Sequence, residues 1–240
     1  NTLGKKKWAI VHSTDAFGTA GGKALTEALT KLGAPPVLDQ GYANQSQDFT
    51  PVVLAVKQSG ADVLGTYFTF ENDLGIFARQ LRQLGVNIPW VGSPSVVAVS
   101  STKLAGPALF GTYGVADFAE DSSATAKAFG KAYRDAYKTA PDNQSAWPYD
   151  AITILSAAIN KAGSTDPTKI REAILATQKF AGAEGEYNFD KNGDGLIQYY
   201  NDGAAAQATA LAAARTSGDQ TAIDAAQAAM PARGISVPTR

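Results

Sequence analysis

Residues 7–18, KWAIVHSTDAFG, place a short apolar run directly before a polar and aromatic cluster. The run at residues 8–11 is typical of a buried strand, and the apolar spacing after it predicts an amphipathic helix that ends at Gly33. A buried strand that leads into such a helix is the repeating unit of a parallel α/β sheet.

Two more units of this kind follow along the chain. The second has a strand near residues 37–38 and a helix with Pro51 in its first turn, and the third has a strand at residues 62–64 and a helix closed by Gly85. A fourth strand begins at residues 88–91. The alternation predicts an α/β fold with an open parallel sheet flanked by helices, and a functional edge at the carboxyl ends of the strands.

Composition excludes several functional classes. The 240 residues are 45% hydrophobic, which is enough for one large or two small domains. With 21 basic and 22 acidic residues and no basic stripe with interleaved aromatics, we expect no nucleic-acid partner. The sequence has no cysteine and no apolar run of the roughly 20 residues that span a bilayer, and its first five residues do not resemble a secretory signal.

Beyond Gly92 the pattern becomes mainly helical. A strand is expected within residues 110–118, and apolar spacing predicts helices over residues 128–137 and 149–159. Asp166 followed by proline predicts the start of another helix. No strand of comparable strength lies between these helices, so either they cover one another or their sheet is missing from this chain.

A turn-rich strand pair is expected at residues 185–189 and 196–200. The connection at residues 190–195 matches the start of a calcium loop, but Asn201 stands where the bidentate glutamate belongs, so a hairpin turn is favoured. Residues 204–229 are alanine-rich, with few large apolar side chains for packing.

Candidate binding residues gather at the ends of the first and third strands. The helix amino termini that follow Val11 and Leu64 offer backbone N–H groups and a positive dipole end, which suit an anionic group. Phe17, Tyr67 and Phe68 offer apolar walls, and the Tyr67 hydroxyl is a polar handle. Each of these aromatic residues is equally compatible with a place in the core.

Other residue types indicate structural roles or an alternative chemistry. Glu71 and Asp73 open the third helix, where acids offset the helix dipole, and this role is favoured over ligand contact. His12 is the only histidine, and a relay with Ser13 and Asp15 is not expected because neighbouring side chains on a strand point to opposite faces. We expect no cofactor and no metal.

Several stretches occur in a fixed order: residues 7–11, 15–18, 48–50, 60–63, 80–85, 147–151 and 189–194. Together they resemble the leucine/isoleucine/valine-binding family, which are type I periplasmic solute-binding proteins of ABC transporters. The resemblance covers residues 3–203, and order and spacing carry it rather than any single motif.

The resemblance implies a two-lobed clamp with the ligand between the lobes. Residues 1–118 would form the α/β second lobe, residues 119–183 the helical part of the first lobe, residues 184–203 the return crossover and residues 204–240 a tail. The family's first segment, which supplies the sheet of the first lobe, has no counterpart before Asn1. A first lobe that lacks this segment would keep its helices and lose the sheet that they cover.

The implied function is the substrate-binding component of an ABC transporter, periplasmic or exported, that delivers a small solute to a membrane permease and is not an enzyme. In the family an aromatic side chain that matches Phe17 lies against the ligand, and the loops after Gly65 and Gly92 complete the wall. The resulting ligand-binding candidates are Phe17, Tyr67, Phe68, Glu71, Ser93, Ser95 and Tyr149. Tyr149 begins an apolar helix face, which favours a core role, and Asp150 suits a cap or a pair.

The ligand itself stays open at this point. The resemblance places an acid for an α-ammonium group just after the fourth strand, but residues 92–95 read GSPS. An amino acid would therefore need Glu71 or Asp73, whereas a small amide, a carboxylate or an aromatic acid needs neither. The alternatives are a small α/β hydrolase that uses Ser13 or Ser93 with Asp15, and a fragment of a binding protein without function of its own.

Overall fold

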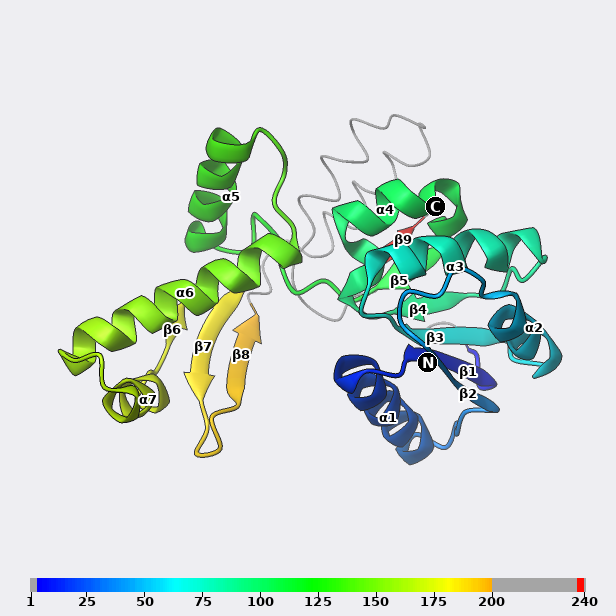
Figure 1. Cartoon of the computed structure of the whole chain (residues 1–240), viewed down its shortest axis with the longest axis horizontal. Coiled ribbons are helices and arrows are strands. Elements are labelled where there is room, and N and C mark those ends of the chain that lie inside the picture. Colours follow the sequence, from blue (N-terminus) through cyan, green and yellow to red (C-terminus); the bar gives the residue numbers. More distant parts are fainter. Residues whose placement is uncertain (1–3, 200–236, 240) are drawn as a thin grey trace. The chain divides into compact units, whose positions relative to one another are not determined.

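The computed structural model of the chain describes residues 4–199 and 237–239. The chain divides into two units, Asn1–Val115 with Ser236–Arg240, and Ala116–Ile235. The first unit is α/β and the second is mainly helical (Figure 1). Within the described ranges, none of the helices has the length and apolar character that a membrane crossing requires.

The first unit is built on a sheet whose described strands lie in the order β2-β1-β3-β4-β5-β9. Strands β1 to β5 are parallel to one another, and β9 is antiparallel to β5 at the edge. The predicted open parallel sheet is therefore confirmed, with one antiparallel strand added. The strands are β1 Trp8–Ser13, β2 Leu38–Tyr42, β3 Val63–Tyr67, β4 Trp90–Gly92, β5 Thr112–Gly114 and β9 Val237–Thr239.

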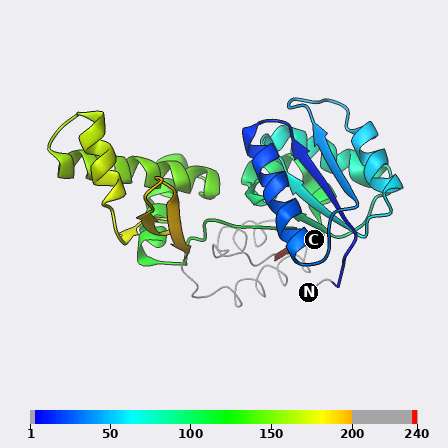
Figure 2. The same cartoon turned by 90° about the horizontal axis from the view of Figure 1, so that it is seen from below.

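Helices cover both faces of this sheet. Helix α1 lies on one face, while α2, α3 and α4 lie on the other (Figures 1 and 2). The expected order of strand and helix is confirmed for the first three units. The helical segments are α1 Ala16–Lys31, α2 Thr50–Gln58, α3 Glu71–Gln83, η1 Pro94–Val97, α4 Val99–Ala105 and η2 Gly106–Leu109.

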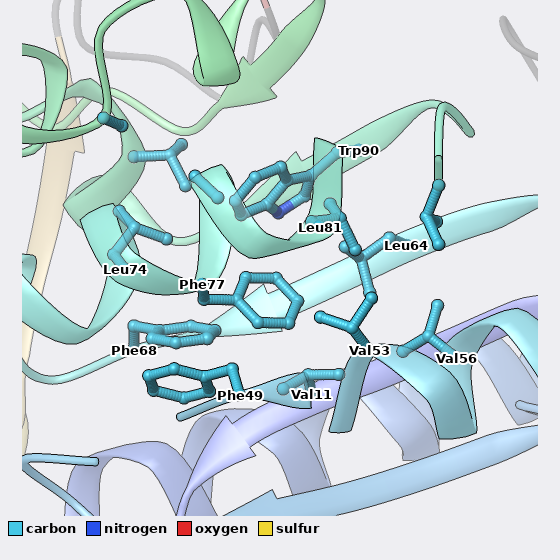
Figure 3. Close-up of a cluster of buried hydrophobic side chains, with 14 of the residues drawn as sticks. Val11, Phe49, Val53, Val56, Leu64, Phe68, Leu74, Phe77, Leu81 and Trp90 are labelled. Carbon is cyan, nitrogen blue, oxygen red and sulfur yellow. The ribbon is translucent and has the colours of Figure 1, made fainter. Parts of the chain in front are cut away.

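The main core lies between the sheet and helices α2 and α3 (Figure 3). Phe77 stands at its centre, with its ring centroid 5.1 Å from that of Phe68 and 5.6 Å from that of Trp90. The Trp90 indole N–H donates to the Thr66 hydroxyl over 2.7 Å, so the polar atom of this buried indole is satisfied. This packing fixes α3, and with it the loop that follows β3.

The second unit holds three described helices and a small antiparallel sheet. Its elements are α5 Ala124–Tyr137, α6 Asn143–Ala162, α7 Pro167–Leu175, β6 Phe180–Ala181, β7 Gly185–Phe189 and β8 Gly195–Tyr199. The predicted hairpin is confirmed as β7 and β8, and Asp190 accepts the N–H groups of Asn192 and Asp194 in its turn. Across the described ranges, no group of acids and histidines is suited to a metal ion.

The helices of this unit leave large apolar side chains exposed. On α6, about half of the surface of each of three large side chains is exposed: 53% for Trp147, 45% for Tyr149 and 63% for Ile152. The described strands of this unit are short and antiparallel, so the helical faces have no parallel sheet against them in the described residues. The alanine-rich residues 204–229 lie outside the described residues.

A buried acidic cluster joins α6 to the turn before β7. The two carboxylate oxygens of Asp150 accept the backbone N–H groups of Ala183 and Glu184 over 2.6 Å and 3.0 Å. Glu184 is 3% exposed, and the Tyr187 hydroxyl donates to one of its oxygens over 2.9 Å. Burial, together with the nearby Asp117 and Asp150 carboxylates, raises the pKa of Glu184 to about 8 against the lowering effect of the Tyr187 hydrogen bond.

Phe77→Ala is expected to lower the free energy of unfolding by about 3 to 5 kcal/mol, because it empties the centre of the aromatic core. Urea denaturation measures the loss. Phe110→Ala is the control, since that side chain is 51% exposed, and its effect should stay under about 1 kcal/mol. An equal loss in the two variants would contradict the assignment of the core.

Glu184→Gln is expected to flatten the dependence of stability on pH. Because the folded pKa is raised, the native chain keeps a proton that the unfolded chain releases, so wild-type stability falls as pH rises from about 4.5 to about 8. Urea unfolding of the second unit between pH 5 and 9 measures this slope. Glu186→Gln, two residues away, should keep the wild-type slope, and a Glu184→Gln slope equal to wild type would contradict the assignment.

Candidate functional site

Strands β1, β2 and β3 are neighbours and parallel, so their carboxyl ends meet at one edge of the sheet. The loops that leave this edge bring together polar groups from three separate parts of the sequence. The Ser13 hydroxyl bonds the Thr69 hydroxyl over 2.9 Å, and the Asn44 amide donates to Asp15 over 2.5 Å. This edge is the candidate functional site.

Asp15 is the most heavily bonded residue of this edge. It is the N-cap of α1, where one oxygen accepts the Gly18 N–H over 2.8 Å while the other accepts from Asn44. Burial opposes ionisation, but hydrogen bonds led by those from Thr69 and Asn44 lower the pKa of Asp15 to about 2. The expectation of an open anion site at this helix start is therefore wrong for the Gly18 N–H, since a fixed negative charge already occupies it.

The start of α3 has a different character. Its N-cap residue is Phe70, which makes no side-chain cap bond, and Glu71 and Asp73 stand in the first turn. Asp73 is 1% exposed, and one of its oxygens accepts the Gln45 N–H over 2.8 Å. Asp73 therefore holds the loop after β2 and does not reach outward, while Glu71 is half-buried at the helix start.

Two of the predicted aromatic residues form a wall at this edge. The Phe17 ring is 49% exposed, and its centroid lies 5.7 Å from that of Tyr67, at an angle of 55°. Phe70 is exposed at the same edge, and sequence reasoning missed it. These rings give an apolar surface beside the fixed charge of Asp15.

Phe68 lies elsewhere. It has no exposed surface, and its ring centroid lies 5.1 Å from that of Phe77 (Figure 3). The Tyr42 ring centroid lies 4.6 Å away. Because a ligand at the edge has no access to a side chain inside the core, Phe68 is left out of the proposed site.

The loop after β4 is small, neutral and buried. The Ser95 hydroxyl donates to the Phe68 carbonyl over 2.7 Å, which ties the loops after β3 and β4 together. Ser93 donates its N–H to the Thr66 carbonyl, and its hydroxyl has no hydrogen bond within the described part of the chain. Tyr149 belongs to the second unit, on α6, where its ring lies 4.8 Å from that of Phe129.

The sequence alone did not reveal Asn44 and Thr69 as partners of Asp15 and Ser13. Both follow strands of the same sheet edge, and this position is the signal that could have found them. His12 does not join the group: one ring nitrogen lies 3.2 Å from Asp39 and the other 2.8 Å from the Ser13 carbonyl.

A family model described as periplasmic binding protein matches residues 1–210. The chain belongs to this family. An amino acid binding protein of Pseudomonas aeruginosa is 29% identical over 204 residues, which are 83% of this chain and 53% of that protein. A Leu/Ile/Val-binding protein homolog of Brucella melitensis is 25% identical over 194 residues, 81% of this chain and 52% of that protein.

Solved structures agree with this family. A leucine binding protein of Thermotoga maritima has a TM-score of 0.76 and 26% identity, covering 82% of this chain and 57% of that one. A type 1 periplasmic binding protein of Bordetella pertussis has a TM-score of 0.73 and 28% identity, covering 84% and 60%. The resemblance and the fold class inferred from the sequence are therefore confirmed. The chain spans about half the length of the curated relatives that it matches.

Asp15→Ala is expected to lower the free energy of unfolding by about 1 to 2 kcal/mol, because it removes a helix cap and the tie to Asn44. The folded pKa of Asp15 is lowered, so the stability that it contributes is present above pH 4 and lost as pH falls toward 2. Urea unfolding at pH 7, 4, 3 and 2 measures the difference from wild type. Asp15→Asn is the comparison variant, since it keeps one capping oxygen for the Gly18 N–H and loses both the charge and the acceptor for the Asn44 amide. A difference between Asp15→Ala and wild type that stays constant to pH 2 would contradict the role of the charge.

Proposed function

We propose that this protein is the substrate-binding component of an ABC transporter, and that it binds a small amino-acid-like solute and presents it to a membrane permease. One observation carries the proposal: the wall of the exposed Phe17 ring and the half-buried Tyr67 ring stands beside the ionised Asp15 at the carboxyl edge of a parallel sheet. The membership of the periplasmic binding protein family supports it, as do relatives named for amino acids.

The charge at this edge favours a solute with a cationic group. The loops after β1, β2 and β3, with the first helical turn after each, carry carboxylates, and neither they nor the neutral loop after β4 carry lysine or arginine. Such a field attracts an ammonium group and repels a plain anion. The carboxylates are Asp15, Asp48 and Glu71, while Asp73 is buried in the same first turn as Glu71.

An amino acid fits this edge better than an aromatic acid does. Its ammonium group is attracted by the acidic loops, and its apolar side chain suits the ring wall. Of the predicted contacts, Phe17, Tyr67 and Glu71 lie at this edge, and we propose that they contact the solute. Ser93 and Ser95 are buried in the loop after β4, so their proposed role is to support the edge. Tyr149 stays a proposal for the opposite lobe, as does the division of the chain at residues 118, 183 and 203.

A periplasmic or exported location and a permease partner follow from the same proposal. Two lobes that close on a solute give the permease a closed form to recognise. The described residues do not favour the hydrolase alternative. The Ser13 side chain is fully buried and bonded to Thr69, and the only histidine of the sequence lies against Asp39. We therefore propose a binding protein without enzyme activity.

The test is a thermal melt of the protein, at the full length of its gene, with matched solutes. Leucine should raise the midpoint by several degrees, because a ligand at about 100 times its dissociation constant adds roughly 2.7 kcal/mol. The deaminated analogue 4-methylpentanoate should not, since it keeps the side chain and carboxylate but lacks the ammonium group. Short amides, aromatic acids and other aliphatic amino acids complete the panel.

Phe17→Ala should reduce the shift to roughly half, because a tenfold loss of affinity leaves about 1.4 kcal/mol of the stabilisation. Phe110→Ala, at an exposed residue just before β5 and so at the opposite edge, should keep the full shift. Equal midpoint shifts with leucine and 4-methylpentanoate would overturn the preference for a cationic group, but not the proposal that the protein binds a small solute. A panel in which no solute moves the midpoint would overturn the proposed function.

A further inference from the structure

We propose that Gly21 of α1 is a positioning residue that seats the Tyr67 ring and so sets the width of the aromatic wall in the solute site. The inference rests on the proposed function, because it concerns the solute that this wall contacts. It adds a residue that lies inside a helix and has no side chain to touch a ligand.

The geometry at Gly21 leaves no room for a side chain. A Cβ atom placed there would lie 2.1 Å from Cδ1, 2.4 Å from Cε1 and 2.5 Å from Cγ of Tyr67. Because atoms that are not bonded to each other do not approach so closely, the Tyr67 ring occupies the space that a side chain at position 21 would fill.

Phe17 and Gly21 share one face of α1. They are four residues apart, so they stand one helical turn from each other. The Tyr67 ring contacts the helix at both places, against Gly21 and against the Phe17 ring at 5.7 Å between centroids. The wall is therefore built by three residues, of which Phe17 and Tyr67 supply the surface and Gly21 supplies the seat.

The next turn of the helix shows the reverse arrangement. There the helix supplies the large side chain and the strand the glycine: a Cβ atom on Gly65 of β3 would lie 2.8 Å from Cδ2 of Leu25. Gly65 and Tyr67 are two residues apart on the strand, so they face the same side. Leu25 on Gly65 and Tyr67 on Gly21 together fix the position of α1 along β3.

A glycine inside a helix is less favourable than an alanine. Gly21→Ala therefore improves the helix while it pushes the Tyr67 ring from its seat, and we expect the variant to stay folded. This separation of stability from binding makes the inference testable.

The experiment is a double-mutant cycle, read by calorimetric titration with the solute that most raises the melting midpoint of the wild-type protein. Gly21→Ala should weaken binding roughly three- to tenfold, which is the scale of an aromatic contact. Tyr67→Ala should weaken it at least as much, and Gly21→Ala should add no further loss in the Tyr67→Ala background. In a Tyr67→Phe background, which keeps the ring, the loss caused by Gly21→Ala should persist.

The matched control is Gly22→Ala, the neighbouring glycine of the same helix. A Cβ atom there would meet the His12 ring, at 2.7 Å and 2.8 Å, and not Tyr67. In protein labelled with fluorotyrosine, the resonance lost in Tyr67→Phe identifies Tyr67. That resonance should shift in Gly21→Ala and stay in place in Gly22→Ala.

Three results would overturn the inference: a Gly21→Ala affinity equal to wild type, losses that add in the Tyr67→Ala background, or an unmoved Tyr67 resonance. If the wild-type protein binds no solute at all, the proposed function fails and the inference fails with it. That case is recognised when the wild-type protein gives no binding heat with any solute of the panel, while the Tyr67 resonance still shifts in Gly21→Ala.

Discussion

The Asp15 carboxylate is the interaction on which the functional edge depends. It caps α1 and receives the Asn44 amide from the loop after β2, and its pKa is lowered by the Thr69 hydroxyl of the loop after β3, which also bonds Ser13. Three loops that are distant in the sequence thereby share one ionised group. The aromatic wall stands on α1 and β3, directly beside two of these loops, so the charge helps to hold the elements that carry the wall.

The sheet and its helices could be predicted from the sequence because each element carries its own signal. Apolar runs, a proline in a first turn and glycines at helix ends are local features, and the structure confirms what they indicated. The site was harder, because the TYFTF run at residues 66–70 offers three aromatic residues, and periodicity cannot tell which one enters the core. The Phe68 ring is buried against the rings of Tyr42 and Phe77, whereas Tyr67 and Phe70 lie at the edge of the sheet.

The acids show the same limit. Glu71 and Asp73 look alike in the sequence, both in a first helical turn, yet Asp73 is buried and holds Gln45. In the second unit, Asp150 was expected to cap or pair, and it receives two backbone N–H groups from a turn more than 30 residues away. Contacts of this kind depend on tertiary packing, which no local pattern encodes.

Strand β9 follows the second unit in the sequence but belongs to the sheet of the first. Thr112 pairs with Thr239, so the whole second unit is an insertion between two neighbouring strands. Closing so long a loop is slow, because its entropic cost comes before the strand contacts that offset it. During synthesis, β9 therefore pairs with β5 only after the second unit has left the ribosome, and among the described strands β5 lacks this neighbour until then.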